Sequence, residues 1–382
     1  MNIGRLQAGI PALNAGLYRR IRFLVGDPVA LVEIPSGKGY TSTLILRDIE
    51  MQRARKSAKA DMVACPKDFE PSGGLSGDRE TATAQAAAES FRRANVSKVI
   101  VDRSLPMIFA EMLHRASIEV QCDIEWGVQE RRQKDEQELV WIQKAQSVTE
   151  EVMELACAMI ARSTADRTGQ LAFEGQSLTS DVMRAKIDQW LIERGFSNPT
   201  SIVACGPIGA DCHNYGAGGI YTGQPVIVDI FPRDKTTLYN GDCTRTVVHG
   251  DIPDKVAEMH RAVVLAKAAA TAETRAGVTG EQVHQATIKS MEASGFQMGL
   301  PPEGSSPDFT SMTHGTGHGL GLEVHEPPLL DRGGPALLVG DVLTIEPGLY
   351  CPAVGGVRVE DMVVVTESGC RNFNRLPEGL RW

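Results

Sequence analysis

The segment THGTGHGLGLEVHEPP, residues 313–328, places three histidines and four glycines in one short stretch. Glycine lets backbone approach a neighbour closely and adopt dihedral angles that other residues avoid. The stretch lacks a P-loop lysine, and it departs from the dinucleotide pattern GxGxxG at the third glycine. It is also not a zincin helix, because His325-Glu326 runs into two prolines. The pattern therefore favours a site that uses imidazole groups over one that holds phosphate.

Acidic residues interrupt apolar runs elsewhere in the same half of the chain. They are Asp229 in PVIVDI (225–230), Glu346 in VLTIE (342–346) and Glu360 in VRVE (357–360). An ionised carboxylate in a buried strand is costly unless a cation or a donor network compensates it. Together with Asp242 and His318, these acids predict the ligand set of a two-metal hydrolytic site. Oxygen-rich sites with one imidazole suit Mn, Co, Zn or Fe.

Composition is that of a globular enzyme of up to two domains. The 382 residues are 42% hydrophobic and 23% charged, with a net charge of −9 and a pI near 5.5. This charge argues against a nucleic-acid partner. The eight cysteines form no CxxC pair, so we expect reduced thiols. Because no stretch is typical of a signal peptide or a membrane span, we expect a cytoplasmic protein without a membrane partner.

The first part of the chain, residues 1–130, alternates predicted strands and helices. Strands are predicted at 29–34, 43–46, 62–65 and 99–101, and helices at 80–94 and 106–116. This alternation predicts an α/β domain. We find no catalytic motif in it.

The remainder, residues 131–382, shows the order helix, helix, strands twice. Helices are predicted at 142–159, 179–193, 253–275 and 280–293, and strand-rich blocks at 202–249 and 314–366. Asp229 and Asp242 are 13 residues apart across one predicted hairpin, and Glu346 and Glu360 are 14 apart across another. A pseudo-repeat with two acids in each half would build one site at a pseudo-twofold seam.

Five motifs in the second part carry a resemblance to a known family. The stretches VDI, GDCTRT, HGTGHGLGLEVHEPP, TIEPGLY and GVRVEDMVVV resemble the pita-bread metallopeptidases, over roughly residues 135–370. That family contains Xaa-Pro aminopeptidases, prolidases and methionine aminopeptidases, with creatine amidinohydrolase as a metal-free relative. The resemblance implies a creatinase/prolidase-like α/β N-terminal domain, 1–130, and an α+β pita-bread catalytic domain with an internal pseudo-twofold repeat, 131–382.

The resemblance also implies a role for each ligand. Asp229 would chelate one metal, Asp242 and Glu360 would bridge both, and His318 and Glu346 would hold the second. The cofactors implied are two divalent ions, with Mn expected and Co, Zn or Fe as alternatives. Such a pair lowers the pKa of a shared water, and Glu346 would take up the water's proton and pass it to the leaving amine.

Four further residues receive roles from the same resemblance. His325 and His213 would stabilise the oxyanion or hold the substrate backbone. His314 stands where the proline-specific branch has a histidine. Arg358 would orient Glu360 or pair with a neighbouring acid.

Several of these residues also have a plainer interpretation when they are taken singly. Asp229 and Asp242 fit the ends of a hairpin, Glu346 fits the entry to the Pro347-Gly348 turn, and His213 fits a loop. Twelve residues separate Asp229 from Asp242, about two more than the family usually has, so substrate preference could differ.

We therefore expect an Xaa-Pro aminopeptidase that acts on a peptide substrate and forms a homodimer. The alternatives are a prolidase, a metal-dependent non-peptidase hydrolase of the creatinase type, a catalytically inert peptide-binding module, and a methionine aminopeptidase. Intact ligands count against the inert module, and His314 with the added N-terminal domain counts against the methionine branch.

Overall fold

The computed structural model describes residues 2–37 and 39–382, which form two compact units, one up to Arg131 and the other Arg132–Trp382. The short helix α5 (Gln129–Arg132) contains this boundary. Each unit has its own hydrophobic core. Among the residues described, no helix has the length and apolar character that a membrane span requires.

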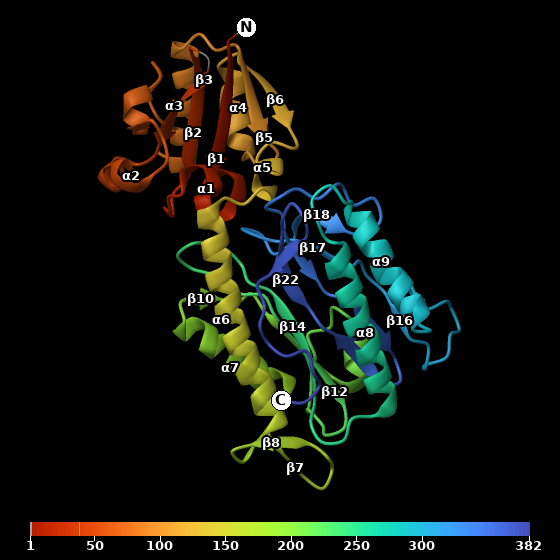
Figure 1. Cartoon of the computed structure of the whole chain (residues 1–382). Helices are drawn as coiled ribbons and strands as arrows, with labels where there is room; N and C mark the ends of the chain where they lie inside the picture. Colours follow the sequence, from red (N-terminus) through yellow and green to blue (C-terminus); the bar gives the residue numbers. More distant parts are fainter. Residues whose placement is uncertain (1, 38) are drawn as a thin grey trace. The chain divides into compact units, whose positions relative to one another are not determined.

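The first unit is a six-stranded sheet with helices on both faces (Figure 1). On β2, Val29 and Leu31 pack with α1 and α2, whereas Ala30 and Val32 pack with α3 and α4. Successive side chains of a strand point to opposite faces, so this continuous apolar run fits a sheet buried on both sides. The strand order is β4-β3-β2-β1-β5-β6. Their bounds are β1 (Ile3–Gly9), β2 (Val29–Ser36), β3 (Gly39–Ile45), β4 (Met62–Ala64), β5 (Lys98–Asp102), β6 (Glu119–Asp123), α1 (Ala15–Ile21), α2 (Met51–Ser57), α3 (Arg79–Arg93) and α4 (Met107–Arg115).

The predicted strands and helices of this unit are present as β2 to β5, α3 and α4. The sequence did not indicate β1, although it lies at the centre of the sheet. The reason is a buried polar pair, because the amide of Gln7 in β1 donates to Asp102 Oδ2 at 2.8 Å. A polar residue at a buried position hides the apolar pattern by which a strand is found.

The second unit begins with the long helix α6 (Glu136–Ala161), drawn in yellow in Figure 1. Asp135 and Glu138 form a capping box that satisfies its first backbone N–H groups. Thr279 and Gln282 form a capping box at α9, whereas α7 has a simple N-cap in which the Thr179 side chain accepts the N–H of Val182. The other helices are α7 (Ser180–Glu193), α8 (Asp254–Glu273) and α9 (Gly280–Ala293).

Two sheets of this unit matter most for the site. The first has the order β11-β12-β14 and the second β18-β17-β19-β22-β23. The pair α6 and α7 precedes the first sheet and the pair α8 and α9 precedes the second, as the pseudo-repeat predicts. The strands are β11 (Ser201–Cys205), β12 (Pro225–Ile230), β14 (Cys243–Val248), β17 (Gly317–Gly319), β18 (Glu326–Leu330), β19 (Val342–Ile345), β22 (Asp361–Val365) and β23 (Cys370–Asn372).

Shorter strands complete the second unit. A four-stranded sheet has the order β15-β16-β20-β21, β10 pairs with β13, and β7, β8 and β9 form a small sheet of their own. They are β7 (Thr164–Ala165), β8 (Leu171–Phe173), β9 (Gln176–Ser177), β10 (Phe196–Ser197), β13 (Arg233–Asp234), β15 (Gln297–Met298), β16 (Ser311–Met312), β20 (Gly348–Cys351) and β21 (Gly355–Arg358).

More of the four acids lie at the ends of strands than the sequence indicated. Asp229 is inside β12, as expected, and Asp242 directly precedes β14. Glu346 follows β19 and Glu360 precedes β22, so the prediction that both lie inside strands is wrong. The β19–β22 ladder ends with Ile345 opposite Asp361, and there the chain leaves it to form the β20–β21 hairpin. Glu346 and Glu360 are therefore the first residues beyond this ladder.

Candidate metal centre

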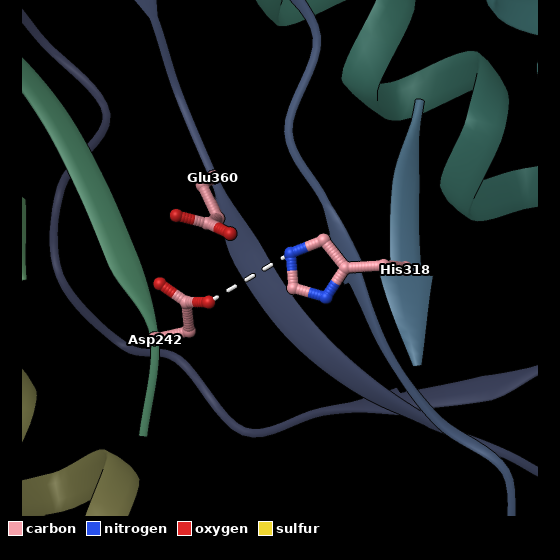
Figure 2. A group of neighbouring side chains, drawn as sticks. All are labelled: Asp242, His318 and Glu360. Carbon is pink, nitrogen blue, oxygen red and sulfur yellow. Dashed lines mark ion pairs between the residues drawn. The ribbon is translucent and has the colours of Figure 1, made fainter. Parts of the chain in front are cut away.

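Side chains from separate stretches of the second unit converge on one point (Figure 2). Each of Asp242, His318 and Glu360 offers one ligand atom, and these atoms lie within 4.8 Å of one another. His318 Nε2 is 3.9 Å from Asp242 Oδ2 and 3.3 Å from Glu346 Oε1. The spacing leaves room for a cation between the carboxylates and the imidazole.

This cluster lines a pocket of about 410 Å³. All nine residues that the sequence singled out line the pocket: His213, Asp229, Asp242, His314, His318, His325, Glu346, Arg358 and Glu360. Apolar side chains, among them Phe231, Val324 and Leu329, complete the wall. The pocket therefore combines the predicted ligands with space for part of a substrate.

The carboxylates are too crowded to be stable as anions without compensation. Burial, with the charges of neighbouring carboxylates, raises the pKa of Asp242 and of Glu360 well above the ordinary value. Asp229 Oδ1 is buried, and no hydrogen-bond partner for it occurs among the residues described. An oxygen-rich donor set with an orphaned carboxylate oxygen fits divalent cations. The residues present thus match the metal pair that the resemblance implies.

The imidazole of His318 is oriented for ligation. Its Nδ1 donates to the carbonyl of Gly319 at 3.1 Å, which turns Nε2 towards the carboxylates. Burial opposes the charged ring, but the hydrogen bond to Glu346 and its charge outweigh burial and raise the pKa of His318. Burial likewise acts against the ionised Glu346, yet His318 lowers the pKa of Glu346 to about 2.

Arg358 pairs with an acid other than the one we first named for it. Its guanidinium donates to Asp229 Oδ2 at 2.7 Å, whereas Glu360 Oε2 accepts from the hydroxyl of Thr244 at 2.8 Å. The same guanidinium donates to the hydroxyl of Tyr350 at 2.9 Å. Arg358 therefore fixes Asp229, in agreement with the alternative that it pairs with a neighbouring acid.

Tyr350 links Arg358 to His314. The Tyr350 hydroxyl lies 2.7 Å from His314 Nε2, while His314 Nδ1 lies 2.7 Å from the carbonyl oxygen of Gly315. Both ring nitrogens of His314 are thus engaged within the protein. This arrangement suits a positioning role better than contact with a reacting atom.

The sequence reasoning missed several residues around the pocket. Thr244 donates a hydrogen bond to Glu360, and Tyr350 joins Arg358 to His314. Asp331 lines the pocket, and its Oδ1 lies 3.5 Å from His284 Nε2. Tyr350 stands inside the quoted motif TIEPGLY, so its place in that motif was the available signal. Thr244 likewise stands inside the quoted motif GDCTRT, whereas Asp331 lies outside the quoted motifs and has no comparable signal.

Solved structures with the same fold cover nearly all of the chain. An Xaa-Pro dipeptidase from Bacillus anthracis has a TM-score of 0.78 and 22% identity, covering 100% of this chain and 95% of its own. An X-Pro aminopeptidase from Thermotoga maritima has a TM-score of 0.77 and 22% identity, covering 99% and 97%. The fold is therefore the two-domain pita-bread architecture.

Sequence comparison agrees with this class of protein. Residues 141–367 match the profile described as metallopeptidase family M24, and the chain belongs to that family. The peptidase YqhT of Bacillus subtilis is 38% identical over 156 residues, which are 40% of this chain and 41% of YqhT. The Xaa-Pro dipeptidase of Pyrococcus horikoshii is 27% identical over 286 residues, or 73% of this chain and 74% of its own. The chain spans about half the length of the first curated relatives that it matches.

Proposed function

We propose that the protein is a dinuclear metal-dependent peptidase that removes an N-terminal residue from peptides with proline in the second position. The observation that carries this proposal is that four carboxylates and His318 line one pocket together. Asp229 would hold one ion, Asp242 and Glu360 would bridge both, and His318 and Glu346 would hold the second. Two such ions polarise the scissile carbonyl and lower the pKa of a shared water. Manganese is the ion we expect.

The protein side chains then divide the remaining work of amide hydrolysis. Glu346 accepts the proton of the attacking water and returns it to the nitrogen of the leaving amine. His213 and His325 line the same pocket and donate to the carbonyl oxygen as it gains negative charge. His314, Tyr350 and Arg358 keep Asp229 in place.

Pocket chemistry supports an aminopeptidase over a dipeptidase. In an Xaa-Pro dipeptide, the proline next to the scissile bond carries the free carboxylate, which needs a cation. Among the described residues that line the pocket, the only lysine or arginine is Arg358, and it already binds Asp229 and Tyr350. A longer peptide, whose proline is followed by an amide, suits the apolar wall of Phe231 and Leu329.

Dipeptidase activity is the second candidate, since relatives from Pyrococcus horikoshii and Pyrococcus furiosus are named Xaa-Pro dipeptidases. Chelated protein should be assayed with Ala-Pro, Ala-Pro-Ala, Met-Ala-Ser and creatine, with and without added Mn²⁺. Metal-dependent release of alanine from Ala-Pro-Ala supports the proposal. Cleavage of Ala-Pro alone would make the enzyme a dipeptidase, and no cleavage of either proline peptide would remove the Xaa-Pro assignment.

A further inference from the structure

Asp242 is held from behind the pocket by a side chain of helix α6. Gln146 is fully buried, and its Nε2 donates to the carbonyl of Asp242 at 2.7 Å. Its Oε1 accepts the backbone N–H of the same residue at 2.9 Å. One amide group therefore satisfies both backbone polar groups of Asp242 and fixes the direction in which its carboxylate leaves the chain.

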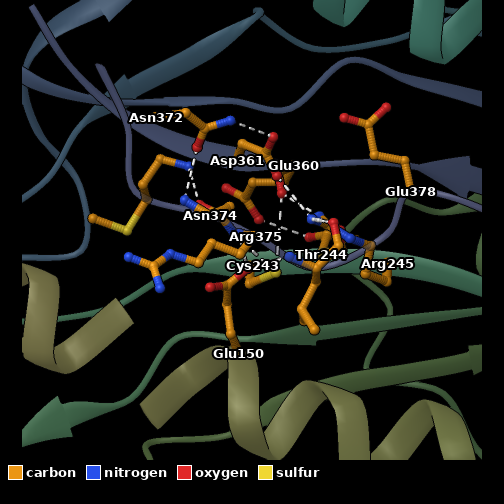
Figure 3. A network of polar contacts seen from close by, with 12 residues as sticks. Glu150, Cys243, Thr244, Arg245, Glu360, Asp361, Asn372, Asn374, Arg375 and Glu378 are labelled. Atoms are coloured by element: carbon orange, nitrogen blue, oxygen red, sulfur yellow. Dashed lines mark hydrogen bonds and ion pairs between the residues drawn. The ribbon is translucent and has the colours of Figure 1, made fainter. Parts of the chain in front are cut away.

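Glu360 is held in a comparable way by two consecutive residues of β14 (Figure 3). The carbonyl of Thr244 accepts the backbone N–H of Glu360 at 3.1 Å, and the hydroxyl of Thr244 donates to Glu360 Oε2 at 2.8 Å. Arg245, fully buried, donates Nη1 to the carbonyl of Glu360 and Nη2 to Asp361 Oδ1 at 2.8 Å. Backbone and side chain of this acid are both fixed.

The two arrangements meet in the segment 374–377. Asn374 Oδ1 accepts from Gln146 Nε2 at 3.0 Å and from the N–H of Met362 at 2.8 Å. Pro377 accepts at its carbonyl from Arg245 Nε at 2.9 Å. Glu150, one turn after Gln146 on α6, accepts the N–H groups of residues 375 and 376. We call Gln146, Thr244, Arg245 and the segment 374–377 the rear clamp.

Charge in and around the rear clamp is balanced. Arg245 and Lys267 both pair with Asp361, and Lys267 also pairs with Glu378 at 2.7 Å. Two cations thus face two anions within hydrogen-bonding distance, which offsets the cost of burying them. The pocket in front of the clamp has an excess of carboxylates instead. The clamp can therefore keep its geometry while the carboxylates in front of it repel one another.

We propose that the rear clamp positions Asp242 and Glu360 to bridge a metal pair, with Gln146 and Asn374 as positioning residues. This inference rests on the proposed function, because it requires that these two acids bridge ions. Carboxylates that repel each other would move apart unless their backbone is anchored. Loss of a group that orients a ligand typically lowers metal affinity about 10- to 100-fold.

The test compares two variants on the same helix. Gln146→Met keeps side-chain length and removes both bonds to Asp242. Gln143→Met is the matched control, because Gln143 lies one turn earlier and donates to the carbonyl of Phe373 without contacting Asp242. Chelated proteins would be titrated with Mn²⁺ by calorimetry, and paramagnetic resonance would report whether the two ions are magnetically coupled through bridging ligands.

We expect Gln146→Met to bind Mn²⁺ about 10- to 100-fold more weakly and to lose the coupled-pair signal, and Gln143→Met to match the unmodified protein. Equal affinity and an unchanged coupled signal in Gln146→Met would overturn the inference. If that variant does not fold, Asn374→Ala provides the same comparison. Failure of the unmodified protein to bind two ions would instead overturn the proposed function itself.

Discussion

Buried acids in this molecule differ in how their charge is compensated, and Glu89 of the first unit contrasts with Asp242 and Glu360 of the second. In the first unit, the carboxylate of Glu89 is 7% exposed and accepts from Arg92 at 2.6 Å and Arg93 at 2.8 Å. The hydrogen bond from Arg92, the largest influence, lowers the pKa of Glu89 to about 2. In the second unit, burial and neighbouring carboxylates raise the pKa of Asp242 and Glu360.

This difference teaches how to distinguish a structural acid from one that awaits a ligand. Glu89 has its own cations, so the chain alone compensates its burial. Arg358 is the one guanidinium among the described pocket residues, and it serves Asp229. Carboxylates that outnumber the cations supplied by the chain, more than burial as such, indicate an ion site.

The largest effect should follow from Glu346→Gln in the second unit. Because glutamine cannot take up a proton, turnover of Ala-Pro-Ala should fall by about 10²- to 10⁴-fold. The thermal midpoint should stay close to that of the unmodified protein. Glu89→Gln, in the first unit, is the control and should leave turnover unchanged. Normal turnover by Glu346→Gln would remove Glu346 from proton transfer.

The second-largest effect should follow from removal of metal, which should destabilise the second unit and leave the first unchanged. Ions at about 1,000 times their Kd stabilise a folded state by about 4 kcal/mol, so chelation should lower stability by a similar amount. Hydrogen exchange followed by mass spectrometry should show faster exchange in peptides containing residues 225–248 and 342–365. Peptides from residues 29–45 and 79–93 should not change. Equal acceleration in both units would contradict an ion site confined to the second.

A third prediction concerns Asp242→Asn, which removes one of the crowded charges. Without metal, this variant should be more stable than the unmodified protein by about 1 kcal/mol, or about 2–4 °C for a unit of this size. With Mn²⁺ the order should reverse, because the variant has lost a bridging ligand. Thermal unfolding at pH 7 with and without Mn²⁺ measures both orders. A variant less stable than the unmodified protein in both conditions would contradict the repulsion argument.

The last prediction concerns Glu89→Gln at neutral pH. A carboxyl whose pKa is lowered on folding contributes stability above its unfolded pKa, and that contribution is lost as pH falls through the folded value. The variant should therefore lower the stability of the first unit by about 1 kcal/mol at pH 7, since its arginine partners are partly exposed.

This difference should shrink as pH falls from 4.5 towards 2. Hydrogen exchange of α3 peptides across this pH range provides the measurement. Glu111→Gln is the control, because Glu111 pairs with Arg115 while 47% exposed and should cost less. A constant difference at all pH values would show that charge is not the cause.

The sequence predicted the identity of the pocket residues better than their contacts. Nine residues were singled out from the sequence, eight of them inside the five motifs and His213 outside them, and all nine line the pocket. Their metal and catalytic roles remain predictions. The sequence could not show that Glu346 and Glu360 lie just beyond the β19–β22 ladder, since strand ends depend on pairing between distant segments. Nor could it indicate that Thr244 holds Glu360, because that bond spans 116 residues of chain.

The origin of the ligands in two sheets has a mechanical consequence. Asp229 and Asp242 belong to the β11-β12-β14 side, whereas His318, Glu346 and Glu360 belong to the side of β17, β19 and β22. A bound ion pair would therefore act as a cross-link between the two sheets. Loss of the ions would remove one link between these two sides, which are also joined by hydrogen bonds such as the one from the Glu360 N–H to the Thr244 carbonyl.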